Sequence, residues 1–443
     1  MRLFNLFSCL CFVFFQQARG FVIKKSFYPT KYLKLQDKSK QFIISGTQEE
    51  RITIKAASVA RMSASLDALD RTTAHSSSSS SSSSHCRIVF GTAALGKADN
   101  PFELLDAAYE KGFHRFDLAR TYGGGLSEQI FGDWMQDRGV DRNSVSIITK
   151  GGMGQDKYGN PERPLLTREG LQEEIKVSLD ALKTDWVEMY MFHRDDPRLH
   201  VSKFVVWANE LVQAGKTKEW GVSNWSFERF QDAYEYAVSN NLEPPRANSP
   251  QFSLAVPKCD VWPTTYSISG PQYKEQIEWY NQHNVELLCW EVLAKGFMAK
   301  PRLWSKEDVD SSTFYKPTEL GSDEWRLQRI QRAYCYDMNY RRRHVATEVA
   351  KKHGCKLSQV VVSFILGMGK NISVIFGSNN LNHLEDMVGL TECQLLDEEA
   401  KMRLSRLLWS PHYQFPQPVL EIPVPTPTDG AFPRWNETAL APS

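Results

Sequence analysis

The chain has 443 residues, of which 42% are hydrophobic and 24% are charged, and its formal net charge is +1. This composition is typical of a globular protein with a large core, and it excludes collagen, wholesale disorder and a disulfide-dense scaffold. The balance of 53 basic against 52 acidic side chains favours neither nucleic acid nor an anionic membrane as a partner. Residues 1–20 carry a net charge of +2 and residues 21–75 carry +5, so the remainder is acidic and the chain joins two differently composed parts.

The N-terminus has the features of a cleaved targeting segment. Residues 3–15 are almost all apolar, and small residues stand at positions 18 and 20. This pattern predicts a signal peptide over residues 1–20. The alternative is a membrane anchor, which needs about 20 apolar residues to cross a bilayer and is disfavoured by the short run.

A leader and a linker are predicted between the signal peptide and the folded domain. Residues 21–75 are rich in Lys, Ser and Thr, which is typical of a transit peptide without stable structure. Residues 76–85 contain an unbroken serine run and read as a flexible linker. A folded domain over 86–408 and a proline-rich tail over 409–443 complete the chain. The two-part leader predicts delivery to a plastid, with secretion or the endoplasmic reticulum as the alternative.

Short β-rich runs alternate with segments of helical periodicity throughout the folded domain. This alternation predicts a single (β/α)8 TIM barrel, with an open doubly wound sheet as the structural alternative. The eight predicted strands cover residues 87–90, 115–117, 146–149, 187–192, 219–222, 247–251, 286–290 and 373–376.

Phosphate-binding fingerprints are missing where other α/β enzymes carry them. The turn at 91–96 lacks the GxGxxG pattern of a dinucleotide fold. Residues 123–127 are rich in glycine but lack the lysine of a P-loop. The triplet 193–195 is similar to a kinase catalytic loop, yet His200 stands where that loop needs Asn. The sequence therefore argues against nucleotide hydrolysis and protein phosphorylation, and no Cys or His spacing indicates a metal site.

Four polar residues stand at or just beyond the ends of predicted strands: Asp117, Tyr122, Lys150 and His193. The carboxyl ends of barrel strands carry the chemistry of such folds. A tyrosine has an ordinary pKa of about 10 and is a weak acid near neutrality, but a nearby ammonium favours its phenolate. A carboxylate can hold that ammonium, and an imidazole can orient a carbonyl oxygen, so the four residues suit carbonyl reduction.

At these motifs the sequence resembles the aldo-keto reductase family over about residues 87–395. Five ordered segments carry the resemblance: Phe116-Asp117-Leu118-Ala119-Arg120-Thr121-Tyr122-Gly123 with Ser127-Glu128, Thr149-Lys150-Gly151, Phe192-His193-Arg194-Asp195-Asp196-Pro197, Gly221-Val222-Ser223-Asn224-Trp225 and Val374-Ile375-Phe376-Gly377-Ser378. The family implies a barrel that binds a nicotinamide cofactor without a Rossmann domain. Tyr122 is then the proton donor, Lys150 the partner that lowers its pKa, Asp117 the residue that orients Lys150, and His193 the residue that positions the carbonyl.

The resemblance also assigns residues to the cofactor. Ser223 and Asn224 match the pair that binds the carboxamide, and Trp290 matches the aromatic ring that stacks on the nicotinamide. Ser249 aligns with a glutamine of the family, and Gln251 can substitute for it from a shifted position.

Two further segments depart from the family pattern. Glu291 places a negative charge in the loop after the seventh predicted strand, and we expect Lys295 to pair with it. Leu293 in the same loop is also assigned to the cofactor. In the last motif, hydroxyl and amide side chains replace the basic residues that usually bind a 2′-phosphate. Such donors can still bind phosphate, although with less charge than Arg offers, and NADPH is therefore expected with NADH as the alternative. The residues assigned to the cofactor in that motif are Gly377, Ser378, Asn379, His383 and Asp386.

The resulting hypothesis is a soluble oxidoreductase that reduces an aldehyde, ketone or sugar carbonyl with a nicotinamide cofactor. One alternative is the reverse chemistry, an NAD-dependent sugar or alcohol dehydrogenase. Another is a cofactor-binding, redox-sensing regulatory subunit of a membrane channel. The expected partner is a small carbonyl substrate, without nucleic acid or a membrane for the mature form, and a monomer is the default expectation.

Overall fold

A computed structural model describes residues 87–153, 166–262, 264–299, 323–388, 390 and 396–409, with the backbone alone for 323–327 and for three short strands between residues 22 and 45. The chain divides into two units, 1–83 and 84–443. The predicted signal peptide, the serine linker and the tail beyond residue 409 lie outside the described residues, as does most of the predicted leader.

Three strands form a small antiparallel sheet in the first unit, in the order β1-β2-β3. They are β1 (Val22–Ile23), β2 (Tyr32–Gln36) and β3 (Gln41–Ser45). Tyr32 pairs with Ser45 and Gln36 with Gln41, which leaves four intervening residues, a common length for a hairpin connection. The composition of a transit peptide did not predict these strands, because the β-rich runs are short and lie among lysines.

The second unit contains eight parallel strands that close into a barrel, which confirms the (β/α)8 prediction and excludes the open sheet. The strands follow chain order around the barrel, and the last strand, β11, pairs with the first, β4, to close it. They are β4 (Ile88–Gly91), β5 (Arg115–Asp117), β6 (Ser146–Gly151), β7 (Val187–Phe192), β8 (Thr217–Ser223), β9 (Ala247–Ser249), β10 (Glu286–Cys289) and β11 (Ile372–Phe376).

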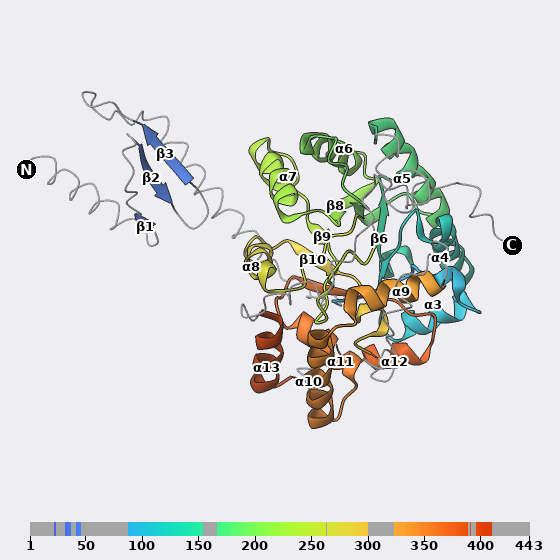
Figure 1. Ribbon diagram of the computed structural model, residues 1–443. Coiled ribbons are helices and arrows are strands. Elements are labelled where there is room, and N and C mark those ends of the chain that lie inside the picture. Colours follow the sequence, from blue (N-terminus) through green and yellow to red (C-terminus); the bar gives the residue numbers. More distant parts are fainter. Residues whose placement is uncertain are drawn as a thin grey trace, which may run out of the picture. The chain divides into compact units, whose positions relative to one another are not determined.

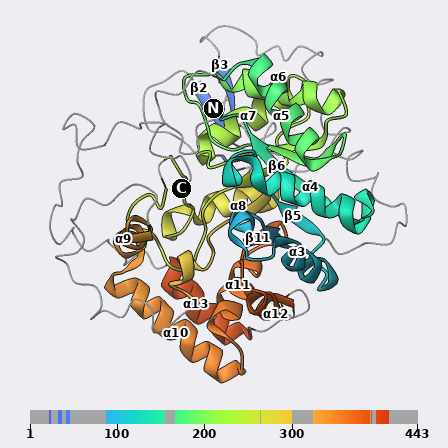
Figure 2. The ribbon, with the colours of Figure 1, turned by 90° about the vertical axis from the view of Figure 1, so that its right-hand side faces the viewer.

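Helices follow the strands and surround the barrel (Figures 1 and 2). The first six are α3 (Pro101–Glu110), α4 (Leu126–Arg138), α5 (Arg168–Leu182), α6 (Val201–Gln213), α7 (Phe227–Ser239) and α8 (Lys274–Gln282). The others are α9 (Asp323–Tyr334), α10 (Asp337–His353), α11 (Leu357–Leu366), α12 (Asn382–Val388) and α13 (Glu398–Trp409). Both views place α10, α11 and α13 side by side, and Arg342 of α10 donates to the carbonyl oxygen of Leu407 in α13. Short 3-10 turns include η2 (Tyr122–Gly125) and η5 (Ala294–Gly296).

Local sequence signals explain where the helices begin and end. Asn100 caps α3 by accepting a hydrogen bond from the backbone N–H of Glu103, and Pro101 occupies the first helical position. The Glu103 carboxylate in turn accepts a hydrogen bond from the Asn100 side-chain amide. Helix α6 ends at Gln213, and Gly215 follows it with a φ of 68°, the left-handed conformation that glycine adopts without strain.

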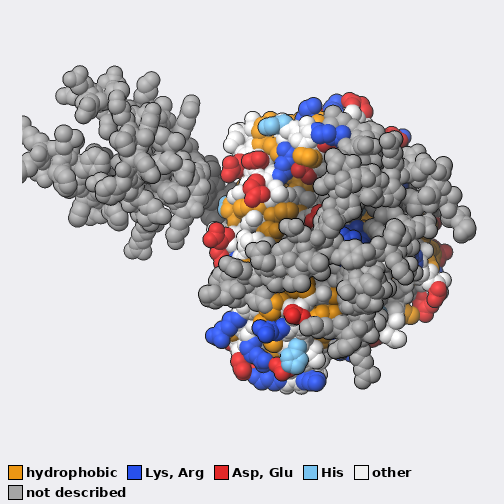
Figure 3. Space-filling model, viewed as in Figure 1, with side chains coloured by type: hydrophobic (Ala, Val, Ile, Leu, Met, Phe, Trp, Pro, Cys, Tyr) orange, Lys and Arg blue, Asp and Glu red, His pale blue; other side chains and the backbone are white. Residues whose placement is uncertain are grey.

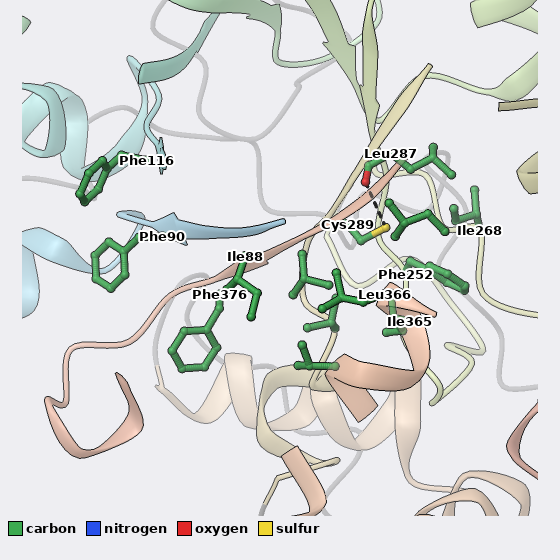
Figure 4. Packing of buried hydrophobic residues seen from close by; sticks show 14 of the residues in the cluster. Ile88, Phe90, Phe116, Phe252, Ile268, Leu287, Cys289, Ile365, Leu366 and Phe376 are labelled. Atoms are coloured by element: carbon green, nitrogen blue, oxygen red, sulfur yellow. Dashed lines mark hydrogen bonds between the residues drawn. The ribbon is translucent and has the colours of Figure 1, made fainter. Parts of the chain in front are cut away.

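Alternation along the strands sorts side chains into two layers. The interior of the barrel holds a small cluster formed by Val89, Ile148, Met189, Met191, Ala247 and Leu288. The intervening residues belong to a larger outer cluster, packed between the barrel and its helices. Figure 4 shows part of that layer, where Phe90 and Phe116 meet with ring centroids 5.9 Å apart. By the same alternation, Lys150 and His193, which lie two positions after Ile148 and Met191, point into the barrel mouth.

The described surface mixes charges of both signs. Figure 3 shows acidic and basic side chains side by side on the described part of one face. Among the described helices, none is both long and apolar enough to cross a bilayer. The four cysteines described, Cys259, Cys289, Cys335 and Cys355, are free thiols.

Candidate active site

The structure brings the four predicted catalytic side chains together at the carboxyl end of the barrel. The Lys150 ammonium lies 2.6 Å from Asp117 Oδ1 and donates a hydrogen bond of 3.0 Å to the Tyr122 hydroxyl. The Tyr122 hydroxyl lies 3.3 Å from Asp117 Oδ2. The His193 ring meets the Tyr122 ring edge to face, with centroids 5.7 Å apart. We refer to these four residues as the tetrad.

The turn that carries Tyr122 depends on glycine. Gly123, Gly124 and Gly125 have φ angles of 60°, 71° and 99°, which side chains with a Cβ adopt at a cost. The turn leads directly into α4 and directs the Tyr122 ring towards Lys150, whose ammonium lies 4.7 Å from the centroid of that ring.

Neighbouring oxygen atoms keep Lys150 protonated although burial opposes its charge. The side chains of Lys150 and Asp117 are each 2% exposed. Burial acts to lower the pKa of Lys150, but Asp117 and the Tyr122 hydroxyl outweigh it, so the pKa is raised. The ammonium also donates to the Leu118 carbonyl oxygen at 2.9 Å, so its charge is met by three oxygen atoms.

The net shift in the pKa of Tyr122 is upward, although Lys150 acts in the direction that the sequence predicts. Burial and the Asp117 carboxylate raise the pKa of Tyr122 above its ordinary value, and the opposing effects of Lys150 and Arg194 do not reverse this. The phenol is therefore fully protonated at neutral pH, which is the form that a proton donor needs. The ammonium acts in the predicted direction, but a single nearby cation cannot offset desolvation together with a facing carboxylate.

His193 is neutral in this environment. Burial lowers the pKa of His193 well below its ordinary value, and the cations of Arg194 and Lys150 add to the effect. Its Nδ1 lies 3.3 Å from the Thr121 hydroxyl, and its backbone N–H donates to the Gly151 carbonyl oxygen. A neutral imidazole can donate a hydrogen bond to a carbonyl oxygen without adding charge. Arg194 was not identified as a candidate from the sequence, although its place beside His193 in the motif was the available signal.

The pKa of His193 predicts a pH dependence of stability. Because the pKa in the fold lies below the unfolded value of about 6.5, only the unfolded chain gains a proton at this site as the pH falls. Stability from this residue is therefore complete above about pH 6.5 and declines below it. We expect His193→Gln to lose less stability than the wild type between about pH 7.5 and 5.5 in urea unfolding. Parallel losses in both proteins would contradict the assignment.

The residues assigned to the carboxamide lie at the ends of β8, β9 and β10. Asn224, with a φ of 61°, donates from its amide to the Ser223 hydroxyl at 2.8 Å. The Ser223 hydroxyl and the Trp290 indole N–H both donate to the Ser249 carbonyl oxygen. The Ser249 hydroxyl donates to the Leu288 carbonyl oxygen at 2.7 Å and is thus engaged within the barrel.

Gln251 differs from Ser249, because its side-chain amide N–H group has no hydrogen-bond acceptor among the described atoms. It is 1% exposed, and its Oε1 accepts hydrogen bonds from the hydroxyls of Ser267 and Ser269 at 2.6 and 3.2 Å. Its Nε2 is buried without a hydrogen-bond partner among the described atoms. A buried amide N–H group without an acceptor lowers the stability of the fold unless a further group accepts its hydrogen bond.

The loop after β10 holds the expected ion pair. The Lys295 ammonium lies 2.7 Å from Glu291 Oε1, as the sequence indicated. Glu291 is 7% exposed and accepts further hydrogen bonds from the Trp262 indole and the Tyr334 hydroxyl. Leu293 is half-buried, and its carbonyl oxygen accepts from the backbone N–H groups of Gly296 and Met298. The negative charge of Glu291 is thereby neutralised by Lys295.

The last motif follows β11. A Cβ on Gly377 would lie 2.7 Å from the Gly91 carbonyl oxygen, so only glycine fits where β11 meets β4. The Ser378 hydroxyl lies 2.8 Å from His383 Nδ1, and Asn379 is exposed. Asp386 forms an ion pair with Lys356, which balances its charge.

Comparisons with known proteins agree with this geometry. The sequence model of the aldo/keto reductase family matches residues 87–404. Versiconal hemiacetal acetate reductase of Aspergillus parasiticus is 24% identical over 320 residues, which cover 67% of this chain and 84% of that protein. A probable voltage-gated potassium channel subunit beta of Oryza sativa subsp. japonica is 24% identical over 311 residues, 69% of this chain and 87% of that protein.

Solved structures share the fold. A thermostable aldo-keto reductase, Tm1743, in complex with the inhibitor epalrestat is similar with a TM-score of 0.51 and 20% identity, covering 72% of this chain and 94% of that one. A putative 2,5-diketo-D-gluconic acid reductase B has a TM-score of 0.50 and 17% identity, covering 72% and 87%. From the family match over most of the barrel, this chain belongs to the aldo-keto reductase family and is an NAD(P)H-dependent oxidoreductase.

Proposed function

We propose that this oxidoreductase reduces an aldehyde, ketone or sugar carbonyl to the alcohol, with hydride from NADPH and a proton from Tyr122. The observation that carries the proposal is the contact of the Tyr122 hydroxyl with the Lys150 ammonium at 3.0 Å, beside a buried Asp117. Together with the family match, this arrangement supports proton donation to a carbonyl oxygen.

Each residue of the tetrad has its own role in the proposed reaction. His193 donates a hydrogen bond to the carbonyl oxygen and so places it near the Tyr122 hydroxyl. As the carbonyl carbon gains hydride, its oxygen takes the Tyr122 proton, and the new phenolate is stabilised by Lys150. Asp117 holds the ammonium at 2.6 Å and keeps it charged. Each proton in this sequence has a defined donor and acceptor.

The residues at the ends of β8, β9 and β10 fit a nicotinamide. The unpartnered Nε2 of Gln251 is a donor for a carboxamide oxygen, and Asn224 with Ser223 lies on the neighbouring strand end. Trp290 is half-buried and supplies an aromatic face. A reduced nicotinamide bound there supplies the hydride. We assign the carboxamide contact to Gln251 rather than Ser249, because the Ser249 hydroxyl is already engaged.

NADPH is the proposed cofactor, although the last motif lacks Arg and Lys. The Ser378 hydroxyl and the His383 ring supply hydrogen-bond donors for a 2′-phosphate. We expect His383→Arg to lower the dissociation constant of NADPH relative to that of NADH by about tenfold, because a guanidinium adds charge and a bidentate fork. Fluorescence titration of both cofactors measures the ratio. An unchanged ratio would show that this segment does not contact the 2′-phosphate.

The function is tested on the purified chain by following quenching of Trp fluorescence on addition of NADPH and, separately, NADH. An aromatic aldehyde is then added, and cofactor oxidation is followed by absorbance. Saturable binding with steady oxidation supports the reductase and identifies the cofactor. Preference for NAD⁺ with oxidation of an alcohol would instead favour the dehydrogenase direction.

A redox-sensing subunit of a channel is the second candidate, favoured by the similarity to the probable potassium channel subunit beta. Tight cofactor binding with turnover that is slow for every carbonyl tested would support this role. Rapid multiple turnover would argue against it.

We further propose that residues 1–20 and 21–75 direct the protein to a plastid, with secretion as the alternative. The support is the apolar run at 3–15 followed by a basic leader rich in Ser and Thr. N-terminal sequencing of the mature protein tests this proposal. A mature start at Phe21 would indicate secretion, and a start near Cys86 would indicate removal of both segments.

A further inference from the structure

Two polar residues at the beginning of α4 are buried although nothing in the proposed reaction uses them. Ser127 and Glu128 are 2% and 0% exposed, and they follow Tyr122 by five and six positions. A buried carboxyl group is costly unless hydrogen bonds or charges compensate it. The contacts of these two residues therefore indicate what their burial achieves.

Ser127 connects α4 to the strand that ends in Asp117. Its hydroxyl lies 2.6 Å from the Thr92 hydroxyl. Thr92 in turn donates to the Asp117 carbonyl oxygen from both its backbone N–H, at 3.0 Å, and its hydroxyl, at 2.9 Å. Thr92 is 1% exposed, so water does not compete for these bonds. The backbone at Asp117 is thus joined to the helix that follows Tyr122.

Glu128 connects the same helix to the strand that carries Lys150. Its Oε1 accepts a hydrogen bond from the Thr149 hydroxyl. Thr149 precedes Lys150, and its side chain points to the outer layer while that of Lys150 points into the barrel. On the other side of Lys150, the backbone N–H of Gly152 donates to Glu174 Oε2 at 2.7 Å. A buried hydrogen bond and a part-buried one therefore flank Lys150.

Close packing limits movement at this strand end. Thr149 is the register partner of Tyr190 on β7. A Cβ on Gly151 would lie 2.1 Å from the Tyr190 hydroxyl oxygen and 2.8 Å from Glu174 Oε2, so neighbouring side chains occupy the space beside the backbone. The charged and titratable groups that act on Glu128 are Arg120 and Lys150, with Tyr190 on the facing strand. Burial raises the pKa of Glu128, while the Thr149 hydroxyl opposes that rise.

The turn on the opposite side of the tetrad has little conformational preference of its own. Tyr122 begins a turn of three glycines with positive φ, and glycine permits many backbone conformations. The distance between Tyr122 Oη and Lys150 Nζ must therefore be set by contacts outside that turn. The first turn of α4 is the element that contacts both neighbouring strand ends.

We propose that Ser127 and Glu128 are positioning residues, which hold Tyr122 and Lys150 at proton-transfer distance by binding Thr92 and Thr149. This inference rests on the proposed reduction of a carbonyl. The Ser127-Glu128 pair is part of the sequence motif but not of the tetrad. The proposal gives this pair a role in positioning the tetrad.

The test removes the Thr149 hydroxyl and then restores it. Thr149→Val keeps the shape of the side chain but loses the bond to Glu128, and we expect kcat to fall by about 10–100-fold because a small misplacement of reacting groups is costly. The dissociation constant of NADPH should change by less than about threefold, since its binding residues lie on other strands. The solvent deuterium isotope effect on kcat should increase, because proton transfer becomes more rate-limiting. Thr149→Ser restores a hydroxyl and should return kcat to within about threefold of the wild type.

A matched control separates positioning from stability. Asp106 accepts a hydrogen bond from the Trp134 indole in α4 at 2.7 Å, far along the helix from its first turn. Asp106→Asn should lower the melting temperature without altering the isotope effect. If Thr149→Val behaves as this control does, or if Thr149→Ser is as impaired as Thr149→Val, the proposal is overturned.

A crystallographic measurement makes the result independent of turnover. If the wild type reduces no carbonyl, the proposed function fails, and the structure of Thr149→Val then decides the positioning role. An increase of the 3.0 Å distance between Lys150 Nζ and Tyr122 Oη supports the proposal. An unchanged distance in the variant overturns it whatever the activity.

Discussion

Replacing Tyr122 by Phe should lower kcat for carbonyl reduction by about 10²–10⁴-fold, the range expected for loss of a general acid. The ring remains, so its edge-to-face contact with His193 and the packing of the turn are retained. Cofactor binding should change by less than about threefold, because the proposed cofactor residues lie at other strand ends. Steady-state kinetics and fluorescence titration on the same preparation measure both quantities.

Tyr109→Phe is the matched control for this prediction. Its hydroxyl donates to Ser144 at 2.8 Å on the outer side of the barrel, so the variant loses one hydroxyl without touching the tetrad. Wild-type turnover in Tyr122→Phe would show that another group donates the proton. A large loss in both variants would indicate a general effect on folding.

Replacing Lys150 by Met should damage both stability and activity. The Asp117 carboxylate is 2% exposed and would lose its cation, which costs about 3–5 kcal/mol of unfolding free energy for a buried pair. Activity should fall by at least about 10²-fold, because the phenolate left by proton transfer has no stabilising charge. Urea unfolding and kcat measure the two effects separately.

The double variant Lys150→Met with Asp117→Asn distinguishes structure from catalysis. Removing the unpaired carboxylate should recover most of the lost stability, because replacing both members of a buried pair is far less costly than removing one. Activity should remain low. Recovery of both properties would mean that Lys150 has only a structural role.

Much of the site was predictable because its signals are local. Strand β6 places Ile148 and Lys150 on the same side by simple alternation, so a polar residue at the end of an apolar strand is expected at the barrel mouth. The same reasoning places Asp117 and His193 there. The pairing of Glu291 with Lys295 was expected because the negative charge of Glu291 needs a basic partner nearby, and the two groups lie 2.7 Å apart.

Other features required contacts between distant segments. Gln251 retains a buried donor only because Ser267 and Ser269 occupy its oxygen, whereas the Ser249 hydroxyl is taken by Leu288 on another strand. The motif containing Ser127 and Glu128 was visible in the sequence, but its links to Thr92 and Thr149 were not.

The amino-acid sequence by itself determined the order of strands and helices, the caps at Asn100 and Gly215, and the alternation that directs the tetrad inwards, because each of these depends on neighbours within a few residues. Only the tertiary structure decided that the barrel closes between β11 and β4 and that Tyr122 has a raised pKa. Both depend on segments far apart in the chain. Closure depends on pairing between strands, and the pKa depends on the burial and charges that Asp117, Lys150 and Arg194 bring to one hydroxyl.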